Sequence, residues 1–289
     1  MTVRNDVLDT RQASELVAAA VTALFVPGDR PERFSKAAAS GAGVVIVDLE
    51  DAVSPANKAN ALAAVISALT RVDMCALVRI NPLGTESSKA EIVALLNVAR
   101  QPKHGLLGLV IPKAEDSTAF RNLASRCEIL DLAFVPLIET AVGVVGAAAI
   151  AGISGVTRLS FGAIDYALDI DAGSDDRFLD HARSTLVVSS RAVGLPAPLD
   201  SPATDIKEVD KVQASAKLAR GFGFGGKLCI HPSQVAVVNQ SFRPGADEVE
   251  WAESVVSAAD GASQIDGRMI DRPVIERAQR ILARVRREK

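Results

Sequence analysis

Residues 22–48 read TALFVPGDRPERFSKAAASGAGVVIVD, and the pattern of this stretch recurs along the whole chain. It holds two short apolar runs, Thr22–Val26 and Val44–Asp48, separated by a longer segment that is rich in alanine. Short runs of this kind are typical of strands that are buried on both faces, and the longer segment is typical of a helix. The stretch therefore predicts a strand, a helix and a second strand.

The same alternation predicts eight buried strands. The apolar runs are Thr22–Val26, Val44–Asp48, Ala76–Ile80, Leu106–Pro112, Leu132–Ile138, Arg158–Gly162, Pro196–Leu199 and Lys227–Ile230. Eight strand-then-helix units within 289 residues favour an α/β protein with a (β/α)8 TIM barrel. An open, doubly wound sheet shows the same alternation and remains the alternative. The barrel is preferred because of the strand number, although the seventh run is short and contains two prolines.

Residues that commonly begin or end helices lie between these runs. The predicted starts are Asp29 before Pro31 and Ser54 before Pro55, and the predicted stops are Gly41 and Gly221, the latter after Val209–Arg220. Beyond the eighth run, two further helical stretches, Asp247–Ala259 and Pro273–Arg286, are joined by a turn that contains glycine. We therefore expect a barrel domain over residues 1–243 and a C-terminal helical extension over residues 244–289.

Composition excludes several classes of protein. The chain carries 32 Lys and Arg against 35 Asp and Glu, a net charge of −3, and 48% of its residues are hydrophobic, so it can bury a large core. Charges of both signs are interspersed, which excludes the basic surface of a nucleic-acid-binding protein. The longest apolar run, Leu16–Val26, has 11 residues, too few to cross a membrane, and lacks the flanks of a signal peptide. A cytoplasmic protein is expected.

Cysteine and histidine are too scattered to predict a disulfide framework or a zinc site. These residues are Cys75, Cys127, Cys229, His104, His181 and His231. Reduced cysteines in the core are expected. The glycine-rich segment GFGFGG, residues 221–226, resembles a dinucleotide-binding motif but precedes a strand instead of following one, so it is interpreted as a helix end and not as an NAD site.

Polar residues appear where the predicted strands end. They are Asp48, Glu50 and Asp51 after the second run, Arg79 and Asn81 at the third, Lys113 after the fourth, Glu139 after the fifth, Asp165 after the sixth and His231 after the eighth. Barrel enzymes carry their catalytic residues at this edge. Each residue alone could cap a helix, face solvent or be bonded in the core. Together they predict a charged site, because such groups are costly to bring close unless they are paired or bind a ligand.

Two of these residues predict a metal site. Glu139 and Asp165 follow consecutive strands, so their side chains are expected to stand next to each other. Adjacent carboxylates repel unless a proton or a cation lies between them, and a small set of oxygen ligands with room for water suits Mg²⁺. A helix cap, or a carboxylate bonded to Arg79, is the alternative interpretation.

Arginine and lysine near the same edge predict anion binding. Arg79 lies within the apolar run ALVRI and therefore needs an anion, which could be a strand-end carboxylate or a substrate carboxylate bound bidentately. A purely structural ion pair is equally compatible with the sequence. Arg30, Arg33 and Lys36 follow the first strand at a helix start, where phosphate could bind, or they could simply face solvent.

Seven segments together resemble the citrate lyase β-subunit-like (CitE-like) branch of the HpcH/HpaI aldolase and citrate lyase family. The segments are LFVPGDRPERF (24–34), VDLEDAV (47–53), VRIN (78–81), PLIET (136–140), FGAIDY (161–166), GKLCIHPSQ (226–234) and GRMIDRPVIERA (267–278). They occur in the family's order and extend over nearly the whole chain. The resemblance implies a Mg²⁺-dependent (β/α)8 lyase, usually a homotrimer or a dimer of trimers, that acts on a CoA thioester.

The resemblance also implies roles for individual residues. Glu139 and Asp165 match the metal ligands, and Arg79 matches the arginine that binds the 2-oxo acid. The residues that match positions lining CoA are Arg30, Arg33, Lys36, Lys58, Ile230 and His231. Asp271 matches a catalytic aspartate that the longer members contribute across a subunit interface, which would account for the C-terminal extension.

The leading hypothesis is a stand-alone lyase that cleaves or forms a malyl-CoA or citramalyl-CoA type thioester, giving acetyl-CoA and a 2-oxo acid. A second hypothesis is a citryl-CoA or citryl-carrier lyase, the β subunit of a citrate lyase. A third is a CoA-thioester-binding protein without turnover. The presence of Glu139, Asp165, Arg79 and Asp271 favours an enzyme.

Overall fold

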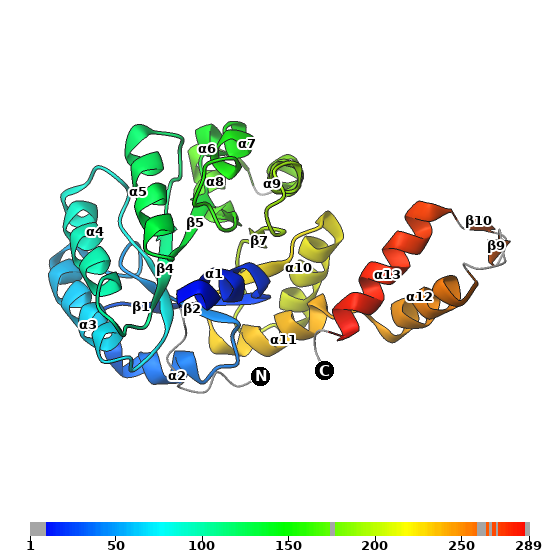
Figure 1. Ribbon diagram of the computed structural model, residues 1–289, viewed down its shortest axis with the longest axis horizontal. Coiled ribbons are helices and arrows are strands. Elements are labelled where there is room, and N and C mark those ends of the chain that lie inside the picture. Colours follow the sequence, from blue (N-terminus) through cyan, green and yellow to red (C-terminus); the bar gives the residue numbers. More distant parts are fainter. Residues whose placement is uncertain (1–9, 174–176, 259–263, 266–267, 270, 287–289) are drawn as a thin grey trace. The chain divides into compact units, whose positions relative to one another are not determined.

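A computed structural model describes residues 10–173, 177–258, 264–265, 268–269 and 271–286 of the chain (Figure 1). The chain divides into two compact units, Met1–Asn239 and Gln240–Lys289, which are considered separately. Among the described residues, no helix combines the length and the apolar character needed to cross a membrane.

The first unit is built around a closed barrel in which each strand lies parallel to the next and β8 lies parallel to β1 (Figure 1). The strands are β1 (Thr22–Pro27), β2 (Val44–Asp48), β3 (Ala76–Arg79), β4 (Leu106–Ile111), β5 (Ala133–Ile138), β6 (Ser160–Phe161), β7 (Leu199–Asp200) and β8 (Gly226–Cys229). Closure excludes the open sheet and confirms the predicted barrel. All eight predicted runs overlap the observed strands.

Helices alternate with these strands and surround the barrel (Figure 1). They are α1 (Thr10–Ala19), α2 (Phe34–Ala38), α3 (Lys58–Thr70), α4 (Glu86–Ala99), α5 (Thr118–Ile129), α6 (Ala141–Val145), α7 (Ala147–Ala151), α8 (Ala163–Asp169), α9 (Phe178–Ala192), α10 (Val209–Phe222) and α11 (Pro232–Phe242), with short 3-10 helices η1 (Pro31–Arg33) and η2 (Pro55–Asn57). The strands are hydrophobic because their side chains face either the barrel interior or this helical layer.

Helix α1 closes the end of the barrel at which the strands begin. Its residues Ala13 and Val17 belong to the same buried cluster as barrel residues such as Ile46 and Val135. Arg158, just before β6 and 1% exposed, donates hydrogen bonds to the carbonyl oxygens of Val17 at 3.2 Å and Ala20 at 2.6 Å. A cation at the C-terminal end of a helix pairs with its free carbonyls and with the helix dipole. The opposite end, where the strands finish, is left open for a site.

Two of the predicted helix limits are wrong. The residue that precedes the first turn of η1 is Arg30, and Asp29 makes no cap but accepts a hydrogen bond from Asn57 Nδ2 at 3.2 Å. Helix α10 continues past Gly221 and ends at Gly223, whose φ of 101° lies in the left-handed region that only glycine adopts at no steric cost. In a segment with several glycines, the sequence alone does not show which one takes that conformation.

The seventh strand is shifted toward the C-terminus relative to its prediction. It comprises Leu199–Asp200 and not Pro196–Leu199. Proline has no N–H to donate to a neighbouring strand, so Pro196 and Pro198 cannot take full part in the ladder. The shift places Asp200 within the strand and Ser201 at its exit.

The second unit contains a pair of helices, α12 (Ala246–Ala258) and α13 (Arg272–Arg286). They pack through a small core of Ala252, Val255, Ala278 and Ile281. Two short antiparallel strands, β9 (Gln264–Ile265) and β10 (Arg268–Met269), lie where the sequence predicts only a turn. Packing of this unit on a neighbouring subunit stays a prediction.

Candidate functional site

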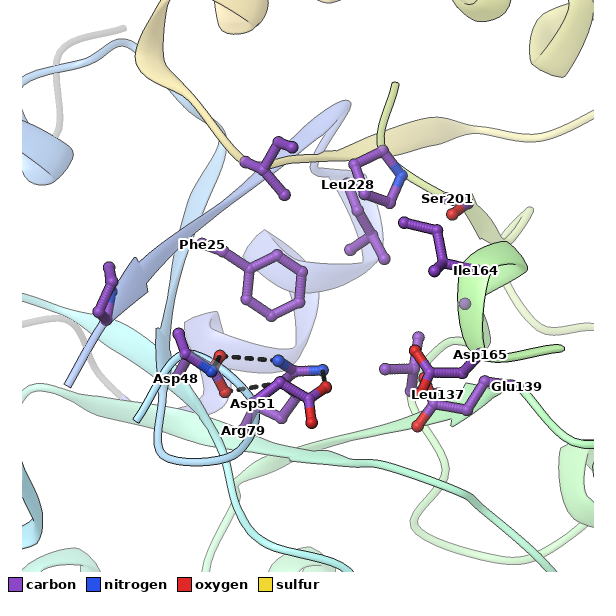
Figure 2. A pocket seen from close by; sticks show the side chains of 15 residues that line it. Phe25, Asp48, Asp51, Arg79, Leu137, Glu139, Ile164, Asp165, Ser201 and Leu228 are labelled. Carbon is purple, nitrogen blue, oxygen red and sulfur yellow. Dashed lines mark hydrogen bonds and ion pairs between the residues drawn. The ribbon is translucent and has the colours of Figure 1, made fainter. Parts of the chain in front are cut away.

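A cavity of about 360 Å³ lies at the open end of the barrel (Figure 2). Its lining comes from the strand ends and the loops that follow them, all within the first unit. The lining residues are Phe25, Pro27, Asp48, Asp51, Ala52, Arg79, Leu137, Glu139, Gly162, Ile164, Asp165, Ser201, Pro202, Leu228 and Ile230. The structure therefore brings Arg79, Glu139, Asp165 and Ile230 of the predicted site residues to one cavity.

Arg79 is the last residue of β3 and is held by three carboxylates. Its Nε and Nη2 atoms bind the two oxygens of Asp48, both at 2.7 Å (Figure 2). Its Nη1 lies 2.9 Å from Glu50 Oε2. Asp51 lies 3.4 Å from Nη1. Burial alone would lower the pKa of Arg79, but the hydrogen bonds and charge of Asp48 outweigh it and raise this pKa. Arg79 is thus a permanently charged group in a fixed orientation.

The loop after β2 is organised by Asp48 and Lys58. The Asp48 carboxylate accepts hydrogen bonds from the backbone N–H groups of Glu50 at 2.9 Å and Ala52 at 3.1 Å. Lys58 Nζ donates to the carbonyl oxygens of Leu49 and Glu50, both at 2.7 Å. Lys58 therefore supports the loop that presents the carboxylate partners of Arg79.

Lys113 connects the carboxylates of the second, fifth and sixth strands. Its backbone has a φ of 47°, an uncommon value outside glycine, and its N–H donates to Glu139 Oε1 at 2.8 Å. Its ammonium group lies 3.1 Å from Glu50 Oε1 and 3.7 Å from Asp165 Oδ1. One lysine thus orients one carboxylate through its backbone and offsets the charge of two others through its side chain.

Glu139 and Asp165 lie close together on one wall of the cavity, as Figure 2 shows. Glu139 directly follows β5 and is 1% exposed, whereas Asp165 lies in the first turn of α8 and not at the strand end itself. Gly162 leaves the space that Glu139 occupies, because a Cβ there would clash with Glu139 Oε2. The absence of a side chain at Gly162 is thus needed for this position of Glu139.

The two carboxylates suit a hard cation with an incomplete protein shell. Burial and then the charge of Glu50 raise the pKa of Glu139 to about 8, so the site disfavours a further uncompensated negative charge. Within the described part of the chain, no group of three or more His, Cys, Asp or Glu side chains could enclose a metal ion. Two oxygen donors leave positions for water and substrate oxygens, which is the manner in which Mg²⁺ usually binds.

The raised pKa of Glu139 makes stability depend on pH. Between its ordinary value of 4.5 and about 8, folded Glu139 keeps a proton that the unfolded chain releases. The contribution to stability is therefore fully present below pH 4.5 and is lost as the pH rises through about 8. We expect the free energy of unfolding of the metal-free protein to fall by up to about 1.4 kcal/mol per pH unit from this group. Urea unfolding of wild type and Glu139→Gln at pH 6, 7 and 8 checks this. If the free energies of unfolding of the two proteins changed with pH by the same amount, the prediction would be contradicted.

The residues predicted to line CoA lie in one sector of the barrel mouth. They follow β8, β1 and β2, which are neighbours in the barrel. Arg30, Arg33 and Lys36 are exposed, and Ile230 is 41% exposed and lines the cavity. The His231 ring is hydrogen-bonded to Ser233 Oγ at 2.7 Å. The cationic side chains of Arg30, Arg33 and Lys36 are thus accessible to solvent after β1, although they do not line the cavity.

Asp271 belongs to the second unit and is exposed at the start of α13. Its Oδ1 accepts a hydrogen bond from the Val274 N–H at 3.2 Å, so within this chain it caps that helix. The lining of the cavity does not include it.

Two buried polar groups near the site were not predicted. Glu91 on α4 is 2% exposed and binds the backbone N–H of Asn81 at 2.7 Å, which fixes the chain after β3. Asp200 is fully buried and lies 2.6 Å from Lys227 Nζ and 3.4 Å from Arg183 Nε. The only signal in the sequence for either residue is that a charged side chain stands near apolar ones. This is the same kind of signal that predicts an anion partner for Arg79.

Comparison with known proteins identifies the family. Residues 22–232 match the family described as HpcH/HpaI aldolase/citrate lyase. This chain belongs to that family. Among its members, a citrate lyase subunit beta-like protein of Mycobacterium tuberculosis is 37% identical over 272 residues, covering 90% of this chain and 94% of that protein.

Other family members are also similar to this chain along most of their length. Citrate lyase subunit beta of Leuconostoc mesenteroides subsp. cremoris is 32% identical, covering 90% of this chain and 91% of that protein. The L-malyl-CoA/beta-methylmalyl-CoA lyase of Cereibacter sphaeroides is 31% identical, covering 90% and 92%. The crystal structure of CitE from Mycobacterium tuberculosis with magnesium, acetoacetate and coenzyme A has a TM-score of 0.80 and 35% identity, covering 92% of this chain and 98% of that one. The family thus contains lyases that share this fold.

Proposed function

We propose that this protein is a Mg²⁺-dependent carbon–carbon lyase that cleaves or forms a β-hydroxyacyl-CoA thioester such as malyl-CoA or citramalyl-CoA, with acetyl-CoA and a 2-oxo acid on the other side of the reaction. The observation that carries the proposal is the cavity itself, in which Glu139 and Asp165 stand beside the fixed guanidinium of Arg79. Magnesium in the CitE complex and the CoA thioesters in the name of the Cereibacter lyase support it.

Glu139 and Asp165 are the residues that would hold Mg²⁺. The ion would supply a Lewis acid beside the oxygens of the 2-oxo acid. Glu139 is kept in place by the Lys113 N–H, which donates to its Oε1. Asp165 has only a loose contact with Lys113 Nζ at 3.7 Å, so it can turn toward a cation beside Glu139. Because the two carboxylates are partly buried, they attract a cation more strongly than they would in water.

Arg79 would bind the carboxylate and oxo group of the acid. Of its partners, Asp51 is the one at the longest distance, 3.4 Å, and its side chain is 60% exposed. A substrate carboxylate can therefore replace Asp51 at Nη1 while Asp48 keeps the guanidinium in orientation. The positive charge then lies where negative charge develops when the C–C bond breaks.

The thioester side of the reaction needs a proton transfer. In the cleavage direction the substrate hydroxyl loses a proton, the C–C bond breaks and the acetyl-CoA enolate takes up a proton. Asp271 of a neighbouring subunit is our candidate for the group that moves this proton. CoA itself would lie along the sector that carries Arg30, Arg33, Lys36, Lys58, Ile230 and His231. A cytoplasmic homotrimer or dimer of trimers is part of this proposal.

Product analysis tests the proposed activity. The protein is incubated with Mg²⁺ and (S)-malyl-, β-methylmalyl-, citramalyl- and citryl-CoA, and glyoxylate, pyruvate and oxaloacetate are measured. We expect acetyl-CoA with glyoxylate or pyruvate, and no product in the presence of EDTA. Mg²⁺-dependent thioester binding without any product would favour a non-catalytic protein instead.

A citryl-CoA or citryl-carrier lyase is the second candidate. The similarity to citrate lyase subunit beta of Leuconostoc, which extends over 91% of that protein, favours it. Release of oxaloacetate from citryl-CoA, together with copurification of carrier and transferase subunits, would favour this second candidate over the leading proposal.

Gly162 should control the affinity for Mg²⁺. Alanine at this position would place a Cβ 2.7 Å from the Glu139 Cβ and displace that carboxylate, although the φ of −108° is open to alanine. We expect Gly162→Ala to fold and to bind Mg²⁺ about 10- to 100-fold more weakly, as measured by isothermal titration calorimetry. Gly221→Ala, where nothing lies within 4 Å of the added Cβ, is the matched control. Equal affinities in both variants would show that Glu139 is not a ligand.

A further inference from the structure

We infer that Lys58 and Glu91 are positioning residues for the 2-oxo acid, and that Lys58 does not bind CoA. Neither side chain lines the cavity, and both act by holding the loop that fixes Arg79. The inference rests on the proposed function, because it takes Arg79 as the group that binds the acid. It also separates Lys58 from the other cationic residues that the family resemblance assigns to CoA.

Leu49 stands at the centre of this arrangement, directly after β2. Its N–H donates to the Arg79 carbonyl oxygen at 2.9 Å, and its own carbonyl oxygen accepts from Lys58 Nζ at 2.7 Å and from Asn81 Nδ2 at 2.9 Å. Leu49 is fully buried and lies between the two acidic residues that contact the Arg79 guanidinium at 2.7 and 2.9 Å. A shift of Leu49 therefore moves both carboxylates relative to the guanidinium.

Glu91 holds Asn81 in place from the outer helix α4. One of its carboxylate oxygens accepts the Asn81 backbone N–H at 2.7 Å, and the other accepts a hydrogen of the Asn81 side-chain amide. Burial raises the pKa of Glu91, while the hydrogen bonds from Asn81 and the positive charge of Lys58 offset part of this effect. The Asn81 amide thus uses one hydrogen for Glu91 and keeps the other for the Leu49 carbonyl.

The ammonium group of Lys58 is already engaged by this loop. Besides Leu49, it binds the carbonyl oxygen of Glu50 at 2.7 Å, so two of its three hydrogens are used by backbone groups of buried residues. Lys58 is half-buried at the start of α3, whereas the cationic residues after β1 are exposed. Moving Lys58 to a CoA phosphate would break two charge-assisted hydrogen bonds. Its contacts thus belong to the acid-binding part of the site.

Loss of either residue should affect the acid and not CoA. Without Lys58 the two loop carbonyl groups lose their cationic donor, and without Glu91 the Asn81 amide can turn away from Leu49. In each case the carboxylates on the two sides of Leu49 can shift, and the Arg79 guanidinium shifts with them. A displacement of about 1 Å is enough to weaken the action of a positioned group by up to about 10²-fold.

Binding of pyruvate and of CoA, each titrated separately by calorimetry into the full-length protein with Mg²⁺, tests the inference. Lys58→Met and Glu91→Gln should each weaken pyruvate binding by about tenfold or more and leave the Kd of CoA unchanged. Lys58→Arg keeps the charge and several donors, so it should recover most of the pyruvate affinity. The double variant should lose much less than the two single losses combined, because both residues act through Leu49.

Lys89→Met is the matched control for the removal of a lysine charge. Lys89 lies on the same helix as Glu91, but its side chain is 61% exposed and pairs with Glu86 on that helix. It should leave both affinities unchanged. Thermal unfolding of each variant shows whether it is folded, and the comparison of Lys58→Met with Lys58→Arg decides the outcome if Glu91→Gln does not fold.

The possible results are distinguishable. Weaker CoA binding with unchanged pyruvate binding in Lys58→Met would overturn the inference, return Lys58 to the CoA site and leave the proposed function intact. Equal losses for both ligands, or a lower Tm without a change in pyruvate affinity, would show a general effect on the fold and would also refute the positioning role. Absence of binding of both ligands to the wild type would refute the proposed function together with the inference.

Discussion

Replacing Glu139 with glutamine is expected to reduce kcat/KM by roughly 10³-fold or more, because the amide keeps the shape of the side chain but removes the charge that we propose to hold Mg²⁺. The variant should fold normally. Glutamine can still accept the Lys113 N–H, whose distance to Glu139 Oε1 is 2.8 Å, and the raised pKa shows that the buried site favours a neutral side chain. Turnover of the best thioester substrate and calorimetric titration with Mg²⁺ are the measurements.

Control variants distinguish the loss of a proposed metal ligand from the loss of any nearby carboxylate. Asp165→Asn should show a similar loss, since the proposal needs both carboxylates. Glu115→Gln removes an exposed carboxylate that lies outside the cavity lining and should retain activity. Full activity in either Glu139→Gln or Asp165→Asn would remove the assignment of that residue as a metal ligand.

Replacing Asp271 with asparagine is expected to lower kcat by about 10² to 10⁴-fold with little change in Mg²⁺ or CoA affinity. Asparagine caps a helix about as well as aspartate, so the contact of residue 271 with the Val274 N–H and the start of α13 should persist. The substitution therefore removes the proposed proton-transfer group without removing the helix cap. Circular dichroism, thermal unfolding and steady-state kinetics measure the separate effects.

Glu276→Gln provides the comparison for Asp271. Glu276 is a neighbouring carboxylate on α13 and lies 2.9 Å from Arg272, an exposed pair whose loss should have little effect on folding or turnover. An unchanged kcat in Asp271→Asn would discard the proton-transfer role and leave Asp271 as a helix cap only.

Much of the barrel could be predicted because each strand carries its own signal. Val44–Asp48 was predicted with its observed limits, since a strand buried on both faces must be apolar along its length. The ends of elements were predicted less well. Gly221 and Gly223 are equivalent in the sequence, and only the packing of α10 against its neighbours selects Gly223 for the left-handed turn. Pro196 and Pro198 likewise shortened the seventh strand at its N-terminal end.

The candidate site was predicted as a set of residue types but not as a set of contacts. The need of Arg79 for an anion follows from its apolar neighbours, yet the identity of the anion, Asp48 with Glu50, depends on the pairing of β2 with β3. The left-handed backbone of Lys113, which turns its N–H toward Glu139, has no signal in the sequence. The space that Gly162 leaves for the Glu139 side chain also has no signal in the sequence.

The amino-acid order alone thus specified an alternating α/β chain, eight buried strands and the charged residues at their ends, because hydrophobic periodicity and the cost of burying a charge act locally. Closure of the barrel then brought Arg79, Glu139 and Asp165 from three strand exits to one cavity. It also set the partners of Arg79 and the burial that raises the pKa of Glu139. Those properties depend on distances between residues far apart in the chain, and such distances exist only once the strands have paired.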